Sequence, residues 1–513
     1  MPQPALSAAD ALHVFLVAVY AVSAAVLALH GLHMAVLSVL ALRATPPSFP
    51  VPDDDALPHV TVQLPLYNEA AVAARVVAAA AAFDYPRFDI QVLDDSTDET
   101  SEIVAEAVAR LRESGLDVVH LRRAHRAGFK AGALAAGLAR SDAPFVAVFD
   151  ADFVPPPDLL RRLAAPLLVD ARAAFAQARW THRNADASWL TRLQAVALDA
   201  HFAVEQFGRS AAGLAFTFNG TAGMWRRAAL DDAGGWRGDT LTEDFDLSLR
   251  AYAAGWQGVF LDDALAPADL PTDAHALRAQ QRRWARGNTE VARLVRRPLL
   301  GAPLPLRLRA LAAVHLAAPL TFVAGFGMLL SYAPAVLTGG LPVGVQLLGA
   351  VGFLGIGVEQ TATAHRRGAG AWRWLWRGVG RTVVLMTGMT ALAPACALAV
   401  GQALGRRRGV FERTPKTSAA APRRYRTARP AGLMAVEAAV FAFALAGAAL
   451  LVAGRLWAWL PFQMLLVVST SVWTFQTWRG GEKAVLPVQR LQADRTFPVP
   501  ASLEARRSDA LSS

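Results

Sequence analysis

The chain has 513 residues, of which 54% are hydrophobic and only 18% charged. Soluble proteins carry about 25% charged residues, and the apolar excess is unevenly distributed. Residues 11–42 and 310–358 contain no charged side chain, whereas residues 84–300 are dense in Asp, Glu and Arg. This distribution excludes both a purely soluble enzyme and a transporter that is buried throughout in the membrane.

The charge balance does not indicate a nucleic-acid partner. The 51 Lys and Arg residues outnumber the 41 Asp and Glu residues, which gives a net charge of +10. The surplus lies in arginine clusters beside apolar segments, where the positive-inside rule places it. We therefore predict a lipid bilayer, and no nucleic acid, as partner. The single cysteine, Cys396, excludes an internal disulfide and a cysteine-based metal site.

The first apolar segment predicts a membrane anchor. Residues 11–42 exceed the roughly 20 residues that a helix needs to cross a bilayer, and they are too long for the core of a signal peptide. Arg43 follows the segment and no Lys or Arg precedes it, so the N-terminus is expected outside and the next domain in the cytosol. Residues 1–43 are assigned to the anchor, and the Pro- and Asp-rich residues 44–58 to a linker.

Residues 59–300 are expected to form a cytosolic α/β domain, because short β-rich runs alternate there with Ala-rich helical stretches. Alternation of this length predicts a parallel sheet covered by helices on both faces. In such sheets ligands bind beyond the carboxyl ends of the strands. Strands are predicted at 60–66, 89–93, 118–121 and 145–149, connected by helices at about 69–83, 98–114 and 130–140.

Membrane segments resume after this domain. Residues 301–480 are expected to form transmembrane and interfacial helices, followed by a disordered cytosolic tail at 481–513. Basic clusters flank the uncharged residues 382–405 on both sides, so we place an interface helix and the loop after it at about 370–420. The spans themselves are predicted at about 310–337, 343–364, 431–454 and 456–478.

Two acidic pairs follow two of the predicted strands. Asp94 and Asp95 follow one strand, and Asp150 and Asp152 follow another. Carboxylates on alternate residues of an extended chain can share one hard divalent cation. Asp is also common in turns, so either pair alone would be ambiguous. Two pairs at the strand ends of one sheet favour a metal-bound nucleotide diphosphate.

Two helical motifs carry further reactive groups. Asp244 lies at the start of a predicted helix, where it is either a residue that stabilises the helix dipole or a general base. Gln280, Arg283 and Trp284 share one face of the helix predicted at 273–297. A guanidinium binds phosphate and an indole can stack on a sugar ring. A basic helix lying on lipid would explain the neighbouring arginines, but it would not need Gln280 or Trp284.

Lysine is rare in this chain, with three against 48 arginines. Lys130 stands in Gly128-Phe-Lys-Ala-Gly132, and Lys416 stands beside Thr414 in the basic loop that starts at Phe411. Both lysines indicate a phosphate contact. For the loop, the alternative is a solvated or lipid-facing charge run.

Six motifs, taken together and in order along the chain, resemble those of the membrane-embedded family 2 glycosyltransferases, the group of cellulose, mannan and hyaluronan synthases. The resemblance is greatest to the cellulose-synthase-like A group, the glucomannan and mannan synthases. The motifs follow the family's order over residues 59–300. They are Gln63-Leu-Pro-Leu-Tyr-Asn-Glu69, Gln91-Val-Leu-Asp-Asp-Ser-Thr-Asp-Glu-Thr100, Phe149-Asp-Ala-Asp-Phe-Val-Pro155, Phe218-Asn-Gly-Thr221, Thr240-Leu-Thr-Glu-Asp-Phe-Asp-Leu247 and Gln280-Gln-Arg-Arg-Trp284.

The resemblance implies a GT-A fold with a Rossmann-like sheet, joined to transmembrane helices, and a divalent cation, Mg²⁺ or Mn²⁺, as cofactor. It implies a base in Asp244, an acceptor contact in Trp284 and metal ligands in Asp150 and Asp152. The residues expected to bind the donor are Tyr67, Glu69, Asp94, Asp95, Lys130, Asp150, Gln280 and Arg283. A gating loop would contain Phe411, Thr414 and Lys416, although Arg413 stands where the family carries Val.

The function that follows is an inverting, processive β-glycosyltransferase. It would polymerise sugar from a GDP-mannose or UDP-glucose type donor onto a growing glycan, and pass this cell-surface polysaccharide across the membrane. We expect a multi-pass protein of the bacterial inner membrane with a cytosolic catalytic domain, open to export or accessory subunits. The alternative is a single addition to a ceramide- or polyprenol-type lipid acceptor. A non-catalytic export subunit is disfavoured because the acidic motifs are intact.

Overall fold

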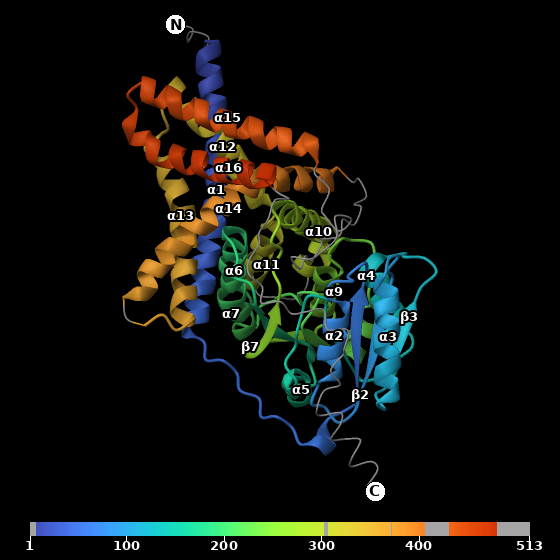
Figure 1. Cartoon of the computed structure of the whole chain (residues 1–513). Coiled ribbons are helices and arrows are strands. Elements are labelled where there is room, and N and C mark those ends of the chain that lie inside the picture. Colours follow the sequence, from blue (N-terminus) through green and yellow to red (C-terminus); the bar gives the residue numbers. More distant parts are fainter. Residues whose placement is uncertain (1–6, 302–305, 371, 406–429, 480–513) are drawn as a thin grey trace.

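The computed structural model describes residues 7–301, 306–370, 372–405 and 430–479. It combines an α/β part with a bundle of long helices, and helix α1 runs along that bundle (Figure 1). The strands are β1 Val60–Leu66, β2 Phe88–Asp94, β3 Val118–Arg122, β4 Phe145–Val148, β5 Ala173–His182, β6 Gly223–Arg226 and β7 Gln257–Ala268.

The seven strands form one sheet in the order β3-β2-β1-β4-β6-β5-β7. The half that contains β1 to β4 is parallel, as predicted from the sequence. β6 runs antiparallel to both β4 and β5, and β7 pairs with β5 in parallel, with a bulge after Ala178. The sheet is therefore mixed, and its three later strands were not anticipated.

Helices cover the sheet on both faces. They are α2 Ala73–Ala81, α3 Thr100–Glu113, α4 Phe129–Leu138, α5 Leu159–Val169, α6 Trp189–Ala200, α7 Phe207–Ala211, α8 Arg227–Asp232 and α9 Glu243–Ala253. Short 3₁₀ turns occur at Asp54–Ala56 and Trp457–Trp459, and a π-helix at His201–Gln206 joins α6 to α7.

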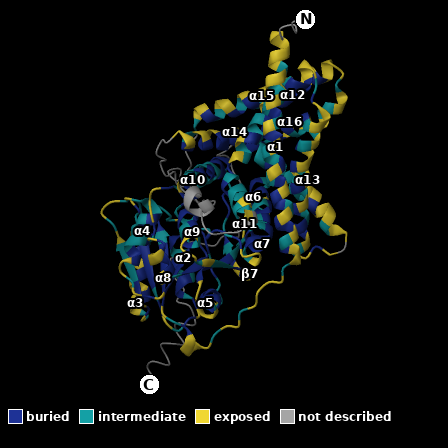
Figure 2. Cartoon of the chain, turned by 180° about the vertical axis from the view of Figure 1, so that it is seen from behind, coloured by how far each residue is buried: buried dark blue, intermediate teal, exposed yellow. Residues whose placement is uncertain are grey.

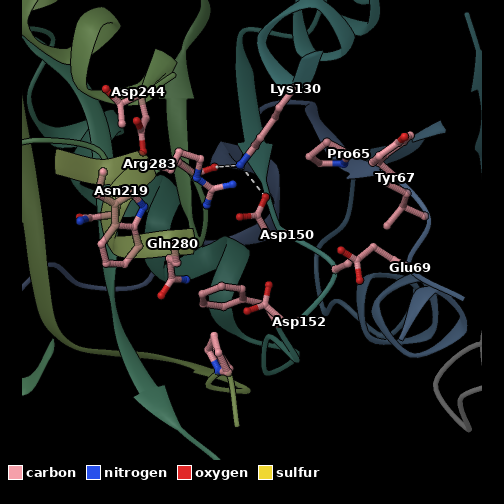
Figure 3. Close-up of a pocket in the computed structure, with 18 of the residues that line it drawn as sticks. Pro65, Tyr67, Glu69, Lys130, Asp150, Asp152, Asn219, Asp244, Gln280 and Arg283 are labelled. Carbon is pink, nitrogen blue, oxygen red and sulfur yellow. Dashed lines mark hydrogen bonds and ion pairs between the residues drawn. The ribbon is translucent and has the colours of Figure 1, made fainter. Parts of the chain in front are cut away.

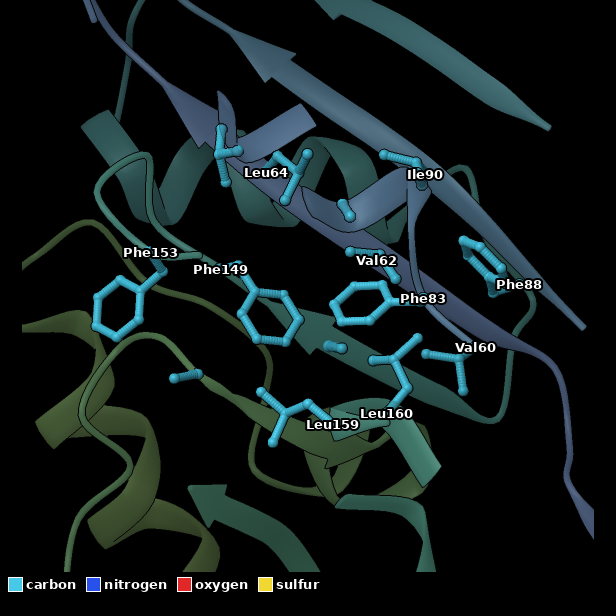
Figure 4. Packing of buried hydrophobic residues seen from close by; sticks show 14 of the residues in the cluster. Val60, Val62, Leu64, Phe83, Phe88, Ile90, Phe149, Phe153, Leu159 and Leu160 are labelled. Atoms are coloured by element: carbon cyan, nitrogen blue, oxygen red, sulfur yellow. The ribbon is translucent and has the colours of Figure 1, made fainter. Parts of the chain in front are cut away.

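The hydrophobic core contains alternate residues of β1. Val60, Val62 and Leu64 are fully buried and pack against Phe83, Phe149 and neighbouring side chains (Figure 4). Thr61 and Gln63, on the other face of the strand, are also fully buried, because both faces of a parallel sheet are covered. This core fixes the carboxyl ends of β1 and β4 side by side.

The membrane-compatible part consists of α10 Ala274–Gly301, α11 Leu306–Ala317, α12 Leu320–Thr338, α13 Val343–Arg366, α14 Arg373–Leu404, α15 Ala431–Ala453 and α16 Leu460–Arg479. Six segments of the described chain are long and apolar enough to cross a bilayer: α1, α12, α13, α14, α15 and Trp457–Arg479. Their outward faces are exposed and apolar (Figure 2), as expected for surfaces that contact lipid.

One predicted span differs from the structure. Residues 310–337 were expected to form a single helix, but the chain breaks into α11 and α12 around Pro319, because proline lacks the N–H that a continuing helix needs. Helix α14 also meets the length and hydropathy criteria for a span. Its placement at the interface therefore stays a prediction, as does the orientation of the chain across the membrane.

Helices α1 and α13 approach closely through glycines. A Cβ on Gly31 would lie 2.6 Å from the carbonyl oxygen of Gly352, and one on Gly355 would meet the carbonyl oxygen of Gly31. Small residues of this kind allow helix backbones to pack closely in membranes. The contact fixes α1 against the bundle.

Candidate active site

A pocket of about 190 Å³ opens at the carboxyl ends of β1 and β4, where sequence analysis expected a ligand. In Figure 3, labelled side chains that follow β1 (Tyr67) and β4 (Asp150) point into the pocket together with Gln280 and Arg283 of α10. The predicted site residues that line it are Tyr67, Glu69, Asp95, Lys130, Asp150, Asp152, Asp244, Gln280, Arg283 and Trp284.

Asp150 and Lys130 form the centre of the pocket. Lys130 Nζ lies 2.5 Å from Asp150 Oδ1 and donates a hydrogen bond of 2.8 Å to the carbonyl oxygen of Gly220. Burial disfavours the charged amine, but Asp150 outweighs this effect and the pKa of Lys130 is raised. The backbone N–H of Asp150 donates to Thr221 Oγ1 at 2.8 Å. A charged lysine is therefore held beside the first carboxylate.

Asp150 and Asp152 are the residues that could hold a divalent cation. Both line the pocket, and Asp152 is 6% exposed. Among the described residues, no cluster of three or more His, Cys, Asp or Glu side chains could hold a metal by itself. Two carboxylates suit Mg²⁺ or a similar hard ion, which usually completes its shell with water and substrate phosphates. The pair fits a cation that arrives with a diphosphate.

The two residues of the first acidic pair have different environments. Asp94 is outside the pocket: its carboxylate accepts hydrogen bonds from Ser96 N–H at 2.8 Å and from Ser101 Oγ at 2.6 Å, and it lies 2.9 Å from His120 Nε2. Burial opposes ionisation, but these bonds prevail and lower the pKa of Asp94 to about 2. Asp95 lines the pocket and pairs with Arg123.

Tyr67 contributes an aromatic side chain to the wall of the pocket that lies across from Asp244 and Arg283 (Figure 3). The guanidinium carbon of Arg126 lies 3.4 Å from the centroid of the Tyr67 ring, which is a cation–π contact. Glu69 follows two residues later and also faces the pocket (Figure 3). Arg126 is a pocket residue that sequence analysis did not identify, because nothing distinguished it from the arginines around it.

Asp244 is half-buried at the start of α9, with Oδ1 accepting the N–H of Phe245 at 2.8 Å. Burial and the adjacent Glu243 raise the pKa of Asp244 to about 7, against the opposing charge of Lys130. Thr242 makes no capping bond with its side chain, so the helix start is not explained by a simple cap. A carboxylate with a pKa near neutrality suits a general base.

Gly220 allows this carboxylate to lie where it does. Its φ of +79° is in the left-handed region, and an added Cβ would lie 2.7 Å from Asp244 Oδ2. Only glycine meets both demands without strain. The sequence motif that contains Gly220 had been noted only as part of the family resemblance, without a role for the residue.

Helix α10 brings Gln280, Arg283 and Trp284 to the same pocket. Burial lowers the pKa of Arg283, while four pocket carboxylates act in the opposite direction. Those carboxylates are Glu243, Asp150, Asp244 and Asp152. Because a guanidinium stays protonated in proteins, Arg283 supplies a fixed positive charge near Asp150 and Asp152.

A second cavity of about 450 Å³ begins where the pocket ends. The two share Asn219, Asp244, Gln280 and Trp284 among their lining residues, and the second continues between α1, α12, α13, α14 and α16. Its surface is mainly apolar, with polar groups that include His201 and Glu359. Asp244 and Trp284 therefore stand at a junction between the pocket and the helical bundle.

Residues 58–287 match the family described as glycosyltransferase like family 2. The chain contains a family 2 glycosyltransferase domain. Glucomannan 4-beta-mannosyltransferase 1 of Oryza sativa subsp. japonica is 41% identical over 256 residues, 48% of this chain and 49% of the relative. Glucomannan 4-beta-mannosyltransferase 2 of Arabidopsis thaliana is 43% identical over 255 residues, 48% of each. The chain spans about half the length of the curated relatives it matches.

Among solved structures, a mannosyltransferase from Pyrobaculum calidifontis in complex with GDP-Man and Mn²⁺ has a similar fold. The TM-score is 0.51 at 20% sequence identity, and the match covers 76% of this chain and 99% of that one. This likeness confirms the GT-A fold of the glycosyltransferase domain.

The structure brings together all but one of the site residues that it describes. Asp94 is the exception, since it organises the loop after β2 from outside the pocket. The expected gating-loop residues Phe411, Thr414 and Lys416 lie outside the described residues. Residues that sequence analysis missed are Arg126, Asn219, Gly220 and Glu243, all of which line the pocket of the glycosyltransferase domain.

Proposed function

We propose that this chain is an inverting, processive β-glycosyltransferase that transfers a hexose, most simply mannose, from a nucleotide sugar to a growing glycan. The observation that carries the proposal is the junction at Asp244 and Trp284. There, a charged pocket suited to a sugar diphosphate opens into a long cavity between membrane-compatible helices. The mannosyltransferase names of the curated relatives support the choice of sugar.

At the donor end, the chain's own cations would neutralise the diphosphate. Lys130 pairs with Asp150, and Arg283 lines the same pocket, so both would bind phosphate oxygens of the donor. A divalent cation bound by Asp150 and Asp152 would add Lewis-acid stabilisation of the leaving group. The complex of the P. calidifontis enzyme with GDP-Man and Mn²⁺ supports this assignment of donor type and metal. Tyr67 and Arg126 would bind the nucleoside side of the donor.

At the acceptor end, Asp244 would act as the base. It would take the proton of an acceptor hydroxyl as that oxygen forms a bond to the anomeric carbon, while the bond from this carbon to the diphosphate breaks. The nucleoside diphosphate leaves with the bonding electrons, and attack from the opposite face inverts the anomeric centre. Trp284 would hold the acceptor sugar by stacking at the junction.

The long cavity would take the product. An apolar surface with scattered polar groups suits a glycan, whose sugar rings have apolar faces and polar edges. Repeated transfer would push the growing glycan from Trp284 into the helical bundle and across the membrane. Single addition to a lipid is not favoured, because the relatives are named as glucomannan synthesising enzymes. Whether the gating loop at 411–416 closes over the donor stays a prediction.

The proposed location is a membrane crossed several times by this chain, with the glycosyltransferase domain on the cytosolic side. The positive residues next to the apolar helices support that orientation. The curated relatives come from plants, so the bacterial inner membrane expected from the sequence gains no support. The pocket and the cavity both lie within this chain. Export or accessory subunits, where present, would add to these two features and would not supply them.

The test uses purified protein in nanodiscs with Mn²⁺ or Mg²⁺ and radiolabelled GDP-mannose or UDP-glucose. We expect label in a product of high mass that a linkage-specific β-glycanase degrades. Asp244→Asn should nearly abolish incorporation while nucleotide binding persists, since general-base help contributes about 10²–10⁴-fold. The matched control is Asp239→Asn, because Asp239 is exposed. Label confined to one sugar on an extractable lipid, or a variant at Asp244 with over about a tenth of the rate, would contradict the proposal.

A further inference from the structure

The π-helix His201–Gln206 interrupts the helical segment that runs from α6 into α7. In a regular α-helix, residues five positions apart point about 140° away from each other. The i→i+5 bonding of a π-helix instead places them one turn apart on the same face. His201 and Gln206 consequently both reach a single side chain, that of Asn219 in the loop before β6.

The hydrogen bonds of this group have one consistent direction. Gln206 Nε2 donates to the carbonyl oxygen of Thr217 at 2.7 Å, which can only accept, so the atom it meets at 2.5 Å is the amide oxygen of Asn219. Asn219 Nδ2 is then a donor, and it lies 3.0 Å from His201 Nε2. His201 must therefore accept with Nε2 and carry its proton on Nδ1.

The carboxylate of Glu205 holds the histidine in that tautomer. His201 Nδ1 lies 3.4 Å from Glu205 Oε1, and Arg209 lies 3.8 Å from the other carboxylate oxygen. Burial opposes ionisation of Glu205, but His201 and Arg209 lower its pKa. Arg209 in turn donates to His33 of α1 at 2.9 Å. The group of polar side chains extends from the catalytic pocket to the first membrane helix.

Asn219 is the start of the segment that shapes the reaction centre. Its own N–H donates to Gln177 Oε1 at 2.9 Å. The next residue, Gly220, accepts from Lys130 and contacts Asp244, and Thr221 accepts the N–H of Asp150. A shift of Asn219 would therefore move the groups that position the base and the first metal-binding carboxylate.

We infer that His201 is a positioning residue. Together with Glu205 it holds Asn219 in one orientation. Through the segment 219–221 it thereby positions Asp244 to take the proton of the acceptor hydroxyl. The inference rests on the proposed function, in which Asp244 is the base. It explains why the chain keeps a π-helix at this place, since a regular helix would turn Gln206 away from Asn219. π-helical segments are frequent at functional sites.

Two substitutions at His201 separate the two ring nitrogens. A glutamine places its terminal amide near the position of Nε2, whereas an asparagine places its amide near Nδ1. His201→Gln should keep the bond to Asn219 and retain kcat within about threefold, whereas His201→Asn should lower kcat by about 10–100-fold, as other outer partners of active sites do. Affinity for GDP and UDP, measured by calorimetry on the full chain in nanodiscs, should not change in either variant.

A double-mutant cycle tests whether His201 and Asn219 act through one bond. Asn219→Leu keeps the size of the side chain and removes its hydrogen bonds, so kcat should fall by about 10–100-fold. Adding His201→Asn should lower kcat by less than about threefold more, because the bond to His201 is already absent. Losses that multiply in the double variant would overturn the inference, as would full activity of His201→Asn.

The outcome for Asp244→Asn separates the inference from the proposed function. If that variant keeps over about a tenth of the wild-type rate, the proposed base is wrong and the role of His201 falls with it. If it is inactive while His201→Asn and Asn219→Leu turn over normally, the proposed function stands and only the positioning role of His201 is wrong. If His201→Asn also loses GDP and UDP binding, His201→Gln decides: a rate within about threefold of wild type supports the inference, and a rate as low as that of His201→Asn overturns it.

Discussion

Arg278 on α10 and Glu437 on α15 form an ion pair in which Arg278 Nη1 lies 2.9 and 2.8 Å from the two carboxylate oxygens, and both side chains are 2% exposed. Trp473 of α16 donates to the same carboxylate at 3.0 Å. Arg278 lies two residues before Gln280, so this pair connects the helix that carries the pocket motif to the last two helices of the bundle. Glu437 is the single charged residue of α15, and such residues in apolar helices usually have a specific partner.

Removal of either partner should destabilise the protein strongly. Arg278→Leu and Glu437→Leu each leave one buried charge without its partner, which costs about 3–5 kcal/mol. The double variant should be more stable than either single variant, because it buries no unpaired charge. Thermal unfolding in detergent, followed by tryptophan fluorescence, measures the difference. As a control, Arg110→Leu breaks an exposed pair with Glu106 and should cost less than about 1 kcal/mol. Additive losses in the double variant would contradict the pairing.

Gly220→Ala should inactivate the enzyme without unfolding it. The substitution forces an alanine into a left-handed conformation, at a cost of about 1–3 kcal/mol, and places Cβ 2.7 Å from Asp244 Oδ2. Displacement of Asp244, the proposed base, by about 1 Å should cost about 10²-fold in rate. Gly213 offers a matched control, because its φ is +65° and an added Cβ meets nothing within 4 Å. Gly213→Ala should show a similar loss of stability with normal turnover, and equal activities of the two variants would contradict the steric argument.

The parallel half of the sheet could be predicted from the sequence because its short β-rich runs alternate with Ala-rich helical stretches. β5 and β7 could not: Ala173–His182 is rich in alanine, which favours helices, and Asp262 and Asp263 interrupt Gln257–Ala268. Here pairing with neighbouring strands decides the structure, and a single sequence does not reveal its partner.

The site shows the same division. The acidic pairs and the α10 motif could be predicted because strand ends and helical spacing place their side chains. The sequence could not show that Asp95 lines the pocket and Asp94 does not. That difference depends on how the chain turns after β2. The sequence also could not assign Asn219, whose role depends on hydrogen bonds from a π-helix that local pattern does not indicate.

Removal of the divalent cation should stop transfer reversibly. A chelator should abolish incorporation of label, and Mn²⁺ should restore it. Without the cation, the negative charges of Asp150 and Asp152 would repel the diphosphate of the donor. Asp152→Asn should raise the Mn²⁺ concentration for half-maximal activity by at least about tenfold, the loss seen even for outer partners of metal sites. Asp186→Asn is the control, since its side chain is 92% exposed. Full activity in excess chelator would show that Lys130 and Arg283 suffice without a metal.

The pH dependence of transfer should follow Asp244. With its pKa raised to about 7 by burial and Glu243, the base form is lost below neutrality, so kcat/KM should fall about tenfold for each pH unit from 7 to 5. The same shift has the opposite sign for stability. Because the folded state binds the proton more tightly than the unfolded chain, this group stabilises the protein at low pH, and that contribution is lost as the pH rises from about 4 to 7. Asp244→Asn should therefore flatten the pH dependence of both the residual rate and the unfolding temperature across this range. A wild-type rate that stays constant from pH 5 to 8, with the protein folded throughout, would exclude Asp244 as the titrating base.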